Sequence, residues 1–142
     1  MTLLEVIATT VSDARAAERG GADRLELVTA MGEGGLTPSI GLIEAVVDAV
    51  GIPVNVIVRP HSRSFVYDAD DYAVMTRDVR AIARTGANGI VAGMLRADGC
   101  VDTEGLARVI EASMACSSRS TARSTRRAIW SRRSTRCCNS MR

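Results

Sequence analysis

Polar side chains that could do chemistry lie in or directly after three apolar runs of the chain. Glu5 lies in the first run, Arg24 and Glu26 lie in the second, and Arg59 and His61 follow the third. Two carboxylates and two guanidiniums could bind an anionic or polyhydroxy ligand, and burial could raise a Glu pKa enough for acid and base work. We take Glu5, Arg24, Glu26, Arg59 and His61 as candidate ligand-binding residues, while no catalytic residue is assigned.

Each candidate also has a structural interpretation. Arg24 could form an ion pair with Glu5 or Glu26 that only fills the interior of the fold. His61 is the single histidine of the chain, and in a polar loop without companion ligands it is most simply solvated. Arg59 ends a run just before Pro60, and for it both interpretations stay open.

Two further motifs have simple structural explanations. The glycine-rich stretch 32–35 could cradle a phosphate, but no Lys-Ser or Lys-Thr pair follows it. Glycines that need a positive φ in a loop explain it equally. The acidic run 68–71 could bind a hard cation, yet at the start of a helix it is explained by capping and by the helix dipole.

The elements that must position these residues alternate between short apolar runs and amphipathic helices. We expect strands at 3–7, 25–28, 54–58 and 90–92, and a polar loop over 59–68. Side chains that recur at helical spacing predict four intervening helices. Their expected N-terminal signals are Ser12 as the N-cap of the first helix, Thr37 with Pro38 for the second, the acidic run for the third and Asp102 for the fourth.

Strands buried on both faces that alternate with such helices predict an α/β fold with a parallel sheet. About four βα units in residues 1–113, with a weak echo between residues 21–23 and 86–88, match the N-terminal half of a (βα)8 TIM barrel. In that fold, functional residues lie at the carboxyl ends of the strands. A small doubly wound fold is the alternative, but no G-x-G-x-x-G follows the first strand.

Composition narrows the class of protein. The chain is 46% hydrophobic and 24% charged, as in an ordinary globular domain, and no apolar run reaches the length of a membrane span. No signal-peptide pattern begins the sequence. Only Cys100 of the four cysteines lies in residues 1–113, so no disulfide is expected there. We predict a reduced, cytoplasmic protein with no membrane partner.

Residues 114–142 form a second kind of sequence. Residues 1–113 hold ten Arg and all sixteen acidic residues, whereas 114–142 hold eight Arg and no acid, Gly or Pro. We expect a disordered tail. It could be a basic arm for nucleic acid, but we favour an out-of-frame origin and do not expect nucleic-acid binding. Back-translation of 115–125 with GC-rich codons, read from the third base, permits LLVTFHRAID, a strand-like sequence.

Residues 1–113 resemble the CutC family of copper homeostasis proteins. The resemblance rests on LLEV at 3–6, GADRLEL at 21–27, EGGLTPS at 33–39, IPV at 52–54 and RP at 59–60. It implies a TIM-barrel fold, and the shifted frame of the tail would restore a TFHRA-type motif of the family. The chain would then be a truncated and impaired half barrel.

The resemblance makes copper the one cofactor to consider, with no demonstrated enzymatic activity. Cysteines near the ends of the first two strands have been proposed as Cu(I) ligands in some members. Here those places are Ile7, Ala8 and Val28, so the family cysteine positions are lost and the metal ligands are unknown. The alternative function is a fragment of a TIM-barrel enzyme that acts on a small polar or anionic metabolite. Open sheet edges also predict self-association.

Overall fold

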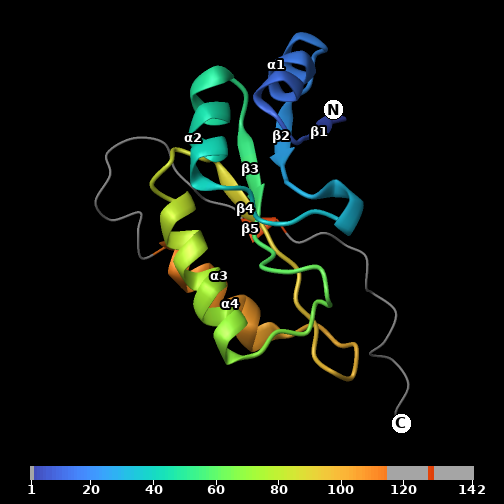
Figure 1. Cartoon of the computed structure of the whole chain (residues 1–142), viewed down its shortest axis with the longest axis vertical. Coiled ribbons are helices and arrows are strands. Elements are labelled where there is room, and N and C mark those ends of the chain that lie inside the picture. Colours follow the sequence, from blue (N-terminus) through green and yellow to red (C-terminus); the bar gives the residue numbers. More distant parts are fainter. Residues whose placement is uncertain (1, 115–127, 130–142) are drawn as a thin grey trace.

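The computed structural model describes residues 2–114 and 128–129, which form one α/β unit (Figure 1). All strand pairs are parallel, and the described strands are ordered β1-β2-β3-β4-β5 across a single sheet. The strands are β1 (Glu5–Ala8), β2 (Arg24–Leu27), β3 (Val54–Ile57), β4 (Gly89–Val91) and β5 (Ala128–Ile129). The helices are α1 (Val11–Arg19), the short 3-10 helix η1 (Met31–Glu33), α2 (Ile40–Ala49), α3 (Ala69–Ile82) and α4 (Thr103–Met114).

The helices cover one face of the sheet, so the predicted α/β fold with four parallel βα units is confirmed. Alternate strand residues such as Leu25, Leu27 and Val56 are fully buried and belong to the same core as Ile43 and Val79 of the helices. Helix α1 packs beside α2, and α3 beside α4 (Figure 1). The opposite strand positions form what we call the inner face: Glu5, Ile7, Arg24, Glu26, Asn55 and Ile57.

Two helix starts differ from the sequence-based expectation. The N-cap of α1 is Thr10 rather than Ser12, because the Thr10 hydroxyl accepts from the Asp13 amide and the Asp13 carboxylate accepts from the Thr10 amide. The N-cap of α2 is Ser39 rather than Thr37. Thr37 is instead engaged with the loop after β3, so its side chain is not available to the helix.

The starts of the other two helices agree with the prediction. Asp68 and Asp71 form a capping box at the start of α3. Asp102 accepts from the Gly105 amide at 3.0 Å in the first turn of α4. The acidic run therefore serves the helix terminus, as expected.

The described part of helix α4 extends to Met114, and the predicted boundary between 113 and 114 stays a prediction. The expectation of a disordered tail falls on residues that, apart from Met114 and the β5 pair, lie outside the described part of the chain. Residues 128 and 129 extend the sheet by pairing with β4. No described helix is both long enough and apolar enough to cross a membrane.

Candidate ligand-binding site

The five predicted site residues fall into two groups rather than one. Glu5 and Arg24 are the first residues of their strands, at the amino edge of the sheet, and Glu26 lies two positions further. Arg59 and His61 follow β3 at the carboxyl edge. Glu5 and Arg24 thus lie at the opposite edge of the sheet from Arg59 and His61: β1 starts two residues later than predicted, with Glu5 as its first residue, and Arg24 is the first residue of β2.

The first group is an ion-paired cluster on the inner face. Glu5 and Arg24 are cross-strand partners, and the Arg24 Nε donates to Glu5 Oε2. Glu26 is half-buried, and its pKa is raised first by desolvation and then by the charge of Glu5, with Arg24 opposing both. Asn55 faces Glu26 in register and is buried, yet its Nδ2 finds no hydrogen-bond partner among the described residues.

Arg59 is a buried guanidinium that holds the glycine-rich loop in place. Its Nη1 donates to the carbonyls of Glu33, Gly34 and Gly35 at 3.2, 3.1 and 3.3 Å. Gly34 has a φ of +83°, and a Cβ there would lie 3.0 Å from Nη1. The glycines thus allow the positive φ of the loop and the close approach of its carbonyls to the Arg59 guanidinium.

The Arg59 backbone and its guanidinium are fixed from two more sides. Its amide donates to Thr37 Oγ1 at 2.8 Å, while the Thr37 amide donates back to the Arg59 carbonyl at 3.0 Å. The guanidinium carbon lies 4.4 Å from the centroid of the Phe65 ring. The Nε atom is buried and has no hydrogen-bond partner in the described part of the chain.

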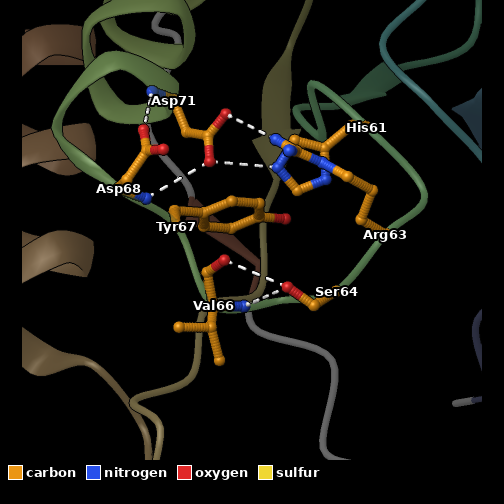
Figure 2. Close-up of a pocket in the computed structure, with 7 residues that line it drawn as sticks. All are labelled: His61, Arg63, Ser64, Val66, Tyr67, Asp68 and Asp71. Atoms are coloured by element: carbon orange, nitrogen blue, oxygen red, sulfur yellow. Dashed lines mark hydrogen bonds and ion pairs between the residues drawn. The ribbon is translucent and has the colours of Figure 1, made fainter.

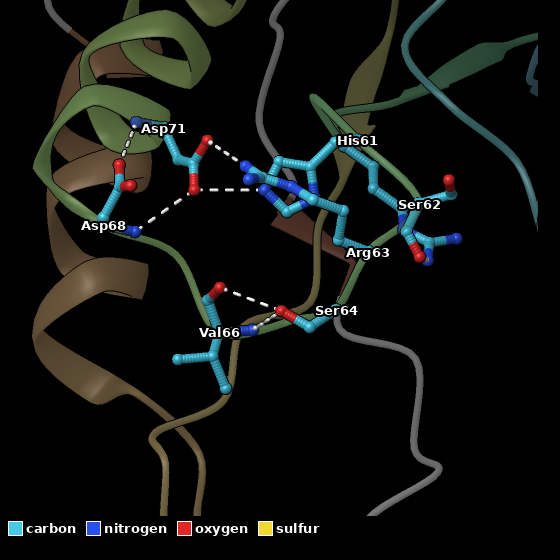
Figure 3. Close-up of polar contacts among 8 residues, drawn as sticks. His61, Ser62, Arg63, Ser64, Val66, Asp68 and Asp71 are labelled. Atoms are coloured by element: carbon cyan, nitrogen blue, oxygen red, sulfur yellow. Dashed lines mark hydrogen bonds and ion pairs between the residues drawn. The ribbon is translucent and has the colours of Figure 1, made fainter.

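His61 is held in a defined orientation by the first turn of α3. Its Nε2 lies 3.0 Å from Oδ2 of Asp71, and the Arg63 Nη2 lies 3.5 Å from the other carboxylate oxygen (Figure 3). The hydrogen bond from His61 lowers the pKa of Asp71. The Nδ1 atom of His61 is buried and lacks a partner among the residues described.

His61, Arg63 and Asp71 line a pocket of about 360 Å³, to whose lining Arg59 does not contribute (Figure 2). The Tyr67 hydroxyl points into it between His61, Arg63 and Ser64, and the Tyr67 and His61 ring centroids are 5.5 Å apart. Tyr67 is 8% exposed, and its hydroxyl has no hydrogen-bond partner within the described ranges. Burial raises the Tyr67 pKa, although nearby Arg59 opposes the shift. The full lining is His61, Arg63, Ser64, Val66, Tyr67, Asp68 and Asp71.

Sequence reasoning missed Tyr67, Asn55 and the second role of Asp71. The signal for Tyr67 was an aromatic residue within the polar loop that also carries the single histidine. The position of Asp71 in the sequence indicates only a helix cap, because its contact with His61 ten residues earlier depends on the path of the loop.

The described residues do not fit a preformed copper site. No three His, Cys, Asp or Glu side chains of the described ranges come together in a way that could hold a metal ion. Ala8 and Val28, at the ends of the first two strands, are buried apolar residues, and Ile7 carries no metal donor. Cys100 is the only cysteine that the structure describes.

Comparison with known proteins gives the family. The family model described as "CutC family" matches residues 2–119. The chain belongs to the CutC family. It is 43% identical over 113 residues to a CutC family protein of Klebsiella pneumoniae strain 342 and 40% identical to one of Salmonella paratyphi B; each match covers 80% of this chain and 46% of the relative. The chain thus spans about half the length of these CutC relatives.

Solved structures agree with the CutC assignment and with half a barrel. A protein of Streptococcus agalactiae, described as a candidate copper homeostasis protein CutC, superposes with a TM-score of 0.75 at 28% identity, covering 80% of this chain and 56% of that one. A phosphoenolpyruvate phosphomutase of Streptomyces platensis reaches a TM-score of 0.56 at 17% identity, covering 82% and 45%. The second match concerns the fold alone. In the barrel, the inner face defined above is the interior of the CutC protein.

Proposed function

We propose that the loop after β3 forms a binding site for a small polar or anionic metabolite, of the kind that TIM-barrel enzymes carry. One observation carries the proposal. Two buried polar atoms of residues that line the pocket, His61 Nδ1 and Tyr67 Oη, have no hydrogen-bond partner in the described part of the chain. Buried polar groups in native proteins are nearly always satisfied, so this pair calls for a ligand or ordered water.

The position and the chemistry of the loop support this proposal. It lies at the carboxyl edge of a parallel sheet, where barrel proteins bind their ligands. The two atoms offer a phenol donor and a histidine nitrogen, and the exposed Arg63 adds a positive charge. The pocket has the size of a small-metabolite site.

Chemical-shift mapping of the 142-residue chain tests this site, with glycolate and inorganic phosphate as probes. Saturable amide shifts should be confined to residues 59–71 and to the glycine-rich loop that contacts Arg59. Shifts centred on Glu5 and Arg24, or no saturable shift with either probe, would contradict the proposal. Acetamide serves as an uncharged control of similar size.

Copper binding is the second candidate, favoured by the description of the related Streptococcus agalactiae structure. We test it by titrating the reduced chain with Cu(I) against a competing chelator. Copper would bind to residues outside the described ranges if stoichiometric binding is retained in Cys100→Ser. The same binding should then be lost when the cysteines at 116, 137 and 138 are replaced by serine. Absence of binding by the wild-type chain would remove copper as a function of this chain.

A further inference from the structure

His61 and Asp71 form a pair whose orientation decides which hydrogen bonds the pocket can make. The Asp71 carboxylate can only accept, so the His61 nitrogen that faces it at 3.0 Å carries the proton in the neutral ring. The proton therefore sits on Nε2, and Nδ1 keeps a lone pair. Nδ1 is the buried atom that lacks a partner among the described residues.

Three further contacts fix Asp71 itself and prevent it from turning away. Its Oδ2 also accepts from the Asp68 amide at 3.2 Å, and its own amide donates to Asp68 Oδ1 at 2.9 Å. Arg63 approaches the other carboxylate oxygen. Because the capping box of α3 anchors the carboxylate, the histidine tautomer is built into the fold rather than chosen by solvent.

We infer that His61 Nδ1 is a fixed hydrogen-bond acceptor that selects ligands carrying a hydroxyl group beside an anionic group, such as a 2-hydroxy acid. This deepens the proposed function and rests on it. The ligand hydroxyl donates to His61 Nδ1, while Tyr67 Oη donates to an anionic oxygen and Arg63, which also lines the pocket, supplies the positive charge. Tyr67 is more than nine-tenths buried and its hydroxyl points into the pocket, which supplies an observation independent of the His61 pair (Figure 2).

The same geometry makes His61 a group that can take a proton from a bound hydroxyl. Transfer from the ligand oxygen to Nδ1 gives an alkoxide and an imidazolium, and the adjacent Asp71 carboxylate stabilises the positive ring. No other reactant is needed for this step.

Nuclear magnetic resonance of the imidazole nitrogens tests the inference directly, because the chain has a single histidine. At a pH where imidazole is neutral, long-range proton–nitrogen spectra should show Nε2 protonated and Nδ1 unprotonated. Asp71→Ala should remove this preference and give the solution mixture of tautomers, whereas Asp70→Ala, at the neighbouring exposed position, should keep it. A proton on Nδ1 in the wild-type chain would overturn the inference.

Ligand selectivity is measured with glycolate and acetate, which differ by one hydroxyl group. Glycolate should bind about 5-fold more tightly, as expected for one added hydrogen bond, and should shift the Nδ1 resonance. Equal binding of the two acids within the loop would overturn the hydroxyl selectivity and leave the proposed anion site standing. Absence of saturable binding by glycolate, acetate and phosphate would overturn the proposed site and the inference together.

Discussion

Two buried tyrosines, Tyr67 and Tyr72, differ in the partners of their hydroxyl groups. The Tyr67 hydroxyl has none within the described part of the chain, whereas the Tyr72 hydroxyl donates to Asp102 Oδ2 at 2.6 Å. Burial raises the pKa of both phenols, and for Tyr72 the Asp102 carboxylate adds to the shift. In the proposed site the Tyr67 hydroxyl is left for a ligand, whereas the Tyr72 hydroxyl bonds within the fold.

Removing each hydroxyl should change stability in opposite directions. Tyr67→Phe should raise the free energy of unfolding by about 1 kcal/mol, because it removes an unsatisfied buried group. Tyr72→Phe should lower the free energy of unfolding by about 1 kcal/mol, because it breaks a hydrogen bond to a carboxylate. Urea denaturation at one fixed protein concentration measures both. A loss of stability in Tyr67→Phe equal to that in Tyr72→Phe would contradict the assignment.

At the scale of residues, the sequence placed Arg59 and His61 after the third strand, where the structure has them, while their role in a binding site stays a proposal. Arg59 and His61 were found because polar residues directly after an apolar strand lie at a predictable edge of a parallel sheet. The structural role of Arg59 was not predictable, since it depends on three carbonyls that lie 24 to 26 residues away in the chain. The contact of His61 with Asp71 was not predictable either, because the path of the loop brings together two residues that lie ten positions apart.

Helix α3 couples the pocket to a helix terminus. Asp71 caps the helix, accepts from the Asp68 amide and faces His61, so one carboxylate supports both the element and the site. Its pKa is lowered by these contacts, with the His61 hydrogen bond as the largest cause. A carboxyl whose folded pKa is depressed stabilises the fold above its unfolded pKa of about 3.9, and this contribution is lost as the pH falls through the folded value.

This linkage predicts the acid sensitivity of an Asp71 variant. Between pH 6 and pH 3, the melting temperature of wild type should fall more than that of Asp71→Asn, because the variant has no charge to lose at this position. Asp70→Asn, one residue away and exposed, is the matched control and should follow wild type. If the melting temperatures of wild type and Asp71→Asn fall in parallel as the pH is lowered, Asp71 does not contribute to the acid sensitivity of the fold.

Helices α3 and α4 meet at a glycine that leaves no space for a side chain. A Cβ on Gly105 would lie 2.0 Å from the Tyr72 hydroxyl and 2.4 Å from the adjacent ring carbon. Gly105→Ala must therefore displace Tyr72 and weaken its bond to Asp102. Gly41 in the first turn of α2 has nothing within 4 Å of its Cβ position and provides a control.

We predict that Gly105→Ala lowers the free energy of unfolding by about 1 to 2 kcal/mol, as overpacking outweighs the gain in helix propensity. Gly41→Ala should leave it unchanged or raise it by up to about 1 kcal/mol. Urea denaturation of the two variants side by side gives the comparison. Stabilisation by Gly105→Ala would mean that the helices repack without cost.

Element types were predictable from the sequence, and element starts were less so. The apolar periodicity placed four strands and four helices in the correct order. Ser12 and Thr37 were wrongly predicted as N-caps because several hydroxyl or carboxyl side chains compete for each helix start. The choice depends on contacts such as the Thr37 bonds to Arg59, which sequence spacing does not reveal.

At the scale of the whole molecule, the chain presents a sheet that its CutC relatives close into a barrel. Within the described residues, β1 pairs only with β2, so its other edge is open. Leu3, Leu4 and Ile7 near that edge are 53%, 50% and 48% exposed. An open strand edge with exposed apolar side chains is a surface for self-association.

We propose that the 142-residue chain self-associates through this edge and the inner face. Sedimentation velocity should show a mass that rises with protein concentration. Ile7→Lys should shift the equilibrium toward monomer, while Val74→Lys, at an exposed apolar position on α3, should not. A monomer at all concentrations that melts cooperatively would contradict the proposal.

The out-of-frame origin of residues 114–142 stays a prediction that DNA can test. The coding sequence after codon 113, read in all three frames, should contain a shifted frame that encodes TFHRA and further βα units. A shifted frame that is closed, or open without this motif, would leave the basic-arm interpretation of the Arg-rich segment.

The proposed ligand site in the loop after β3 depends on buried polar atoms without partners among the described residues. The most direct measurement is the glycolate affinity of Tyr67→Phe beside those of wild type and Tyr72→Phe. We expect Tyr67→Phe to bind about 5-fold more weakly than wild type while being at least as stable, as loss of one hydrogen bond to the ligand requires. Tyr72→Phe should bind as wild type does. Equal glycolate affinities for wild type and Tyr67→Phe would contradict the proposed contact between the Tyr67 hydroxyl and the ligand.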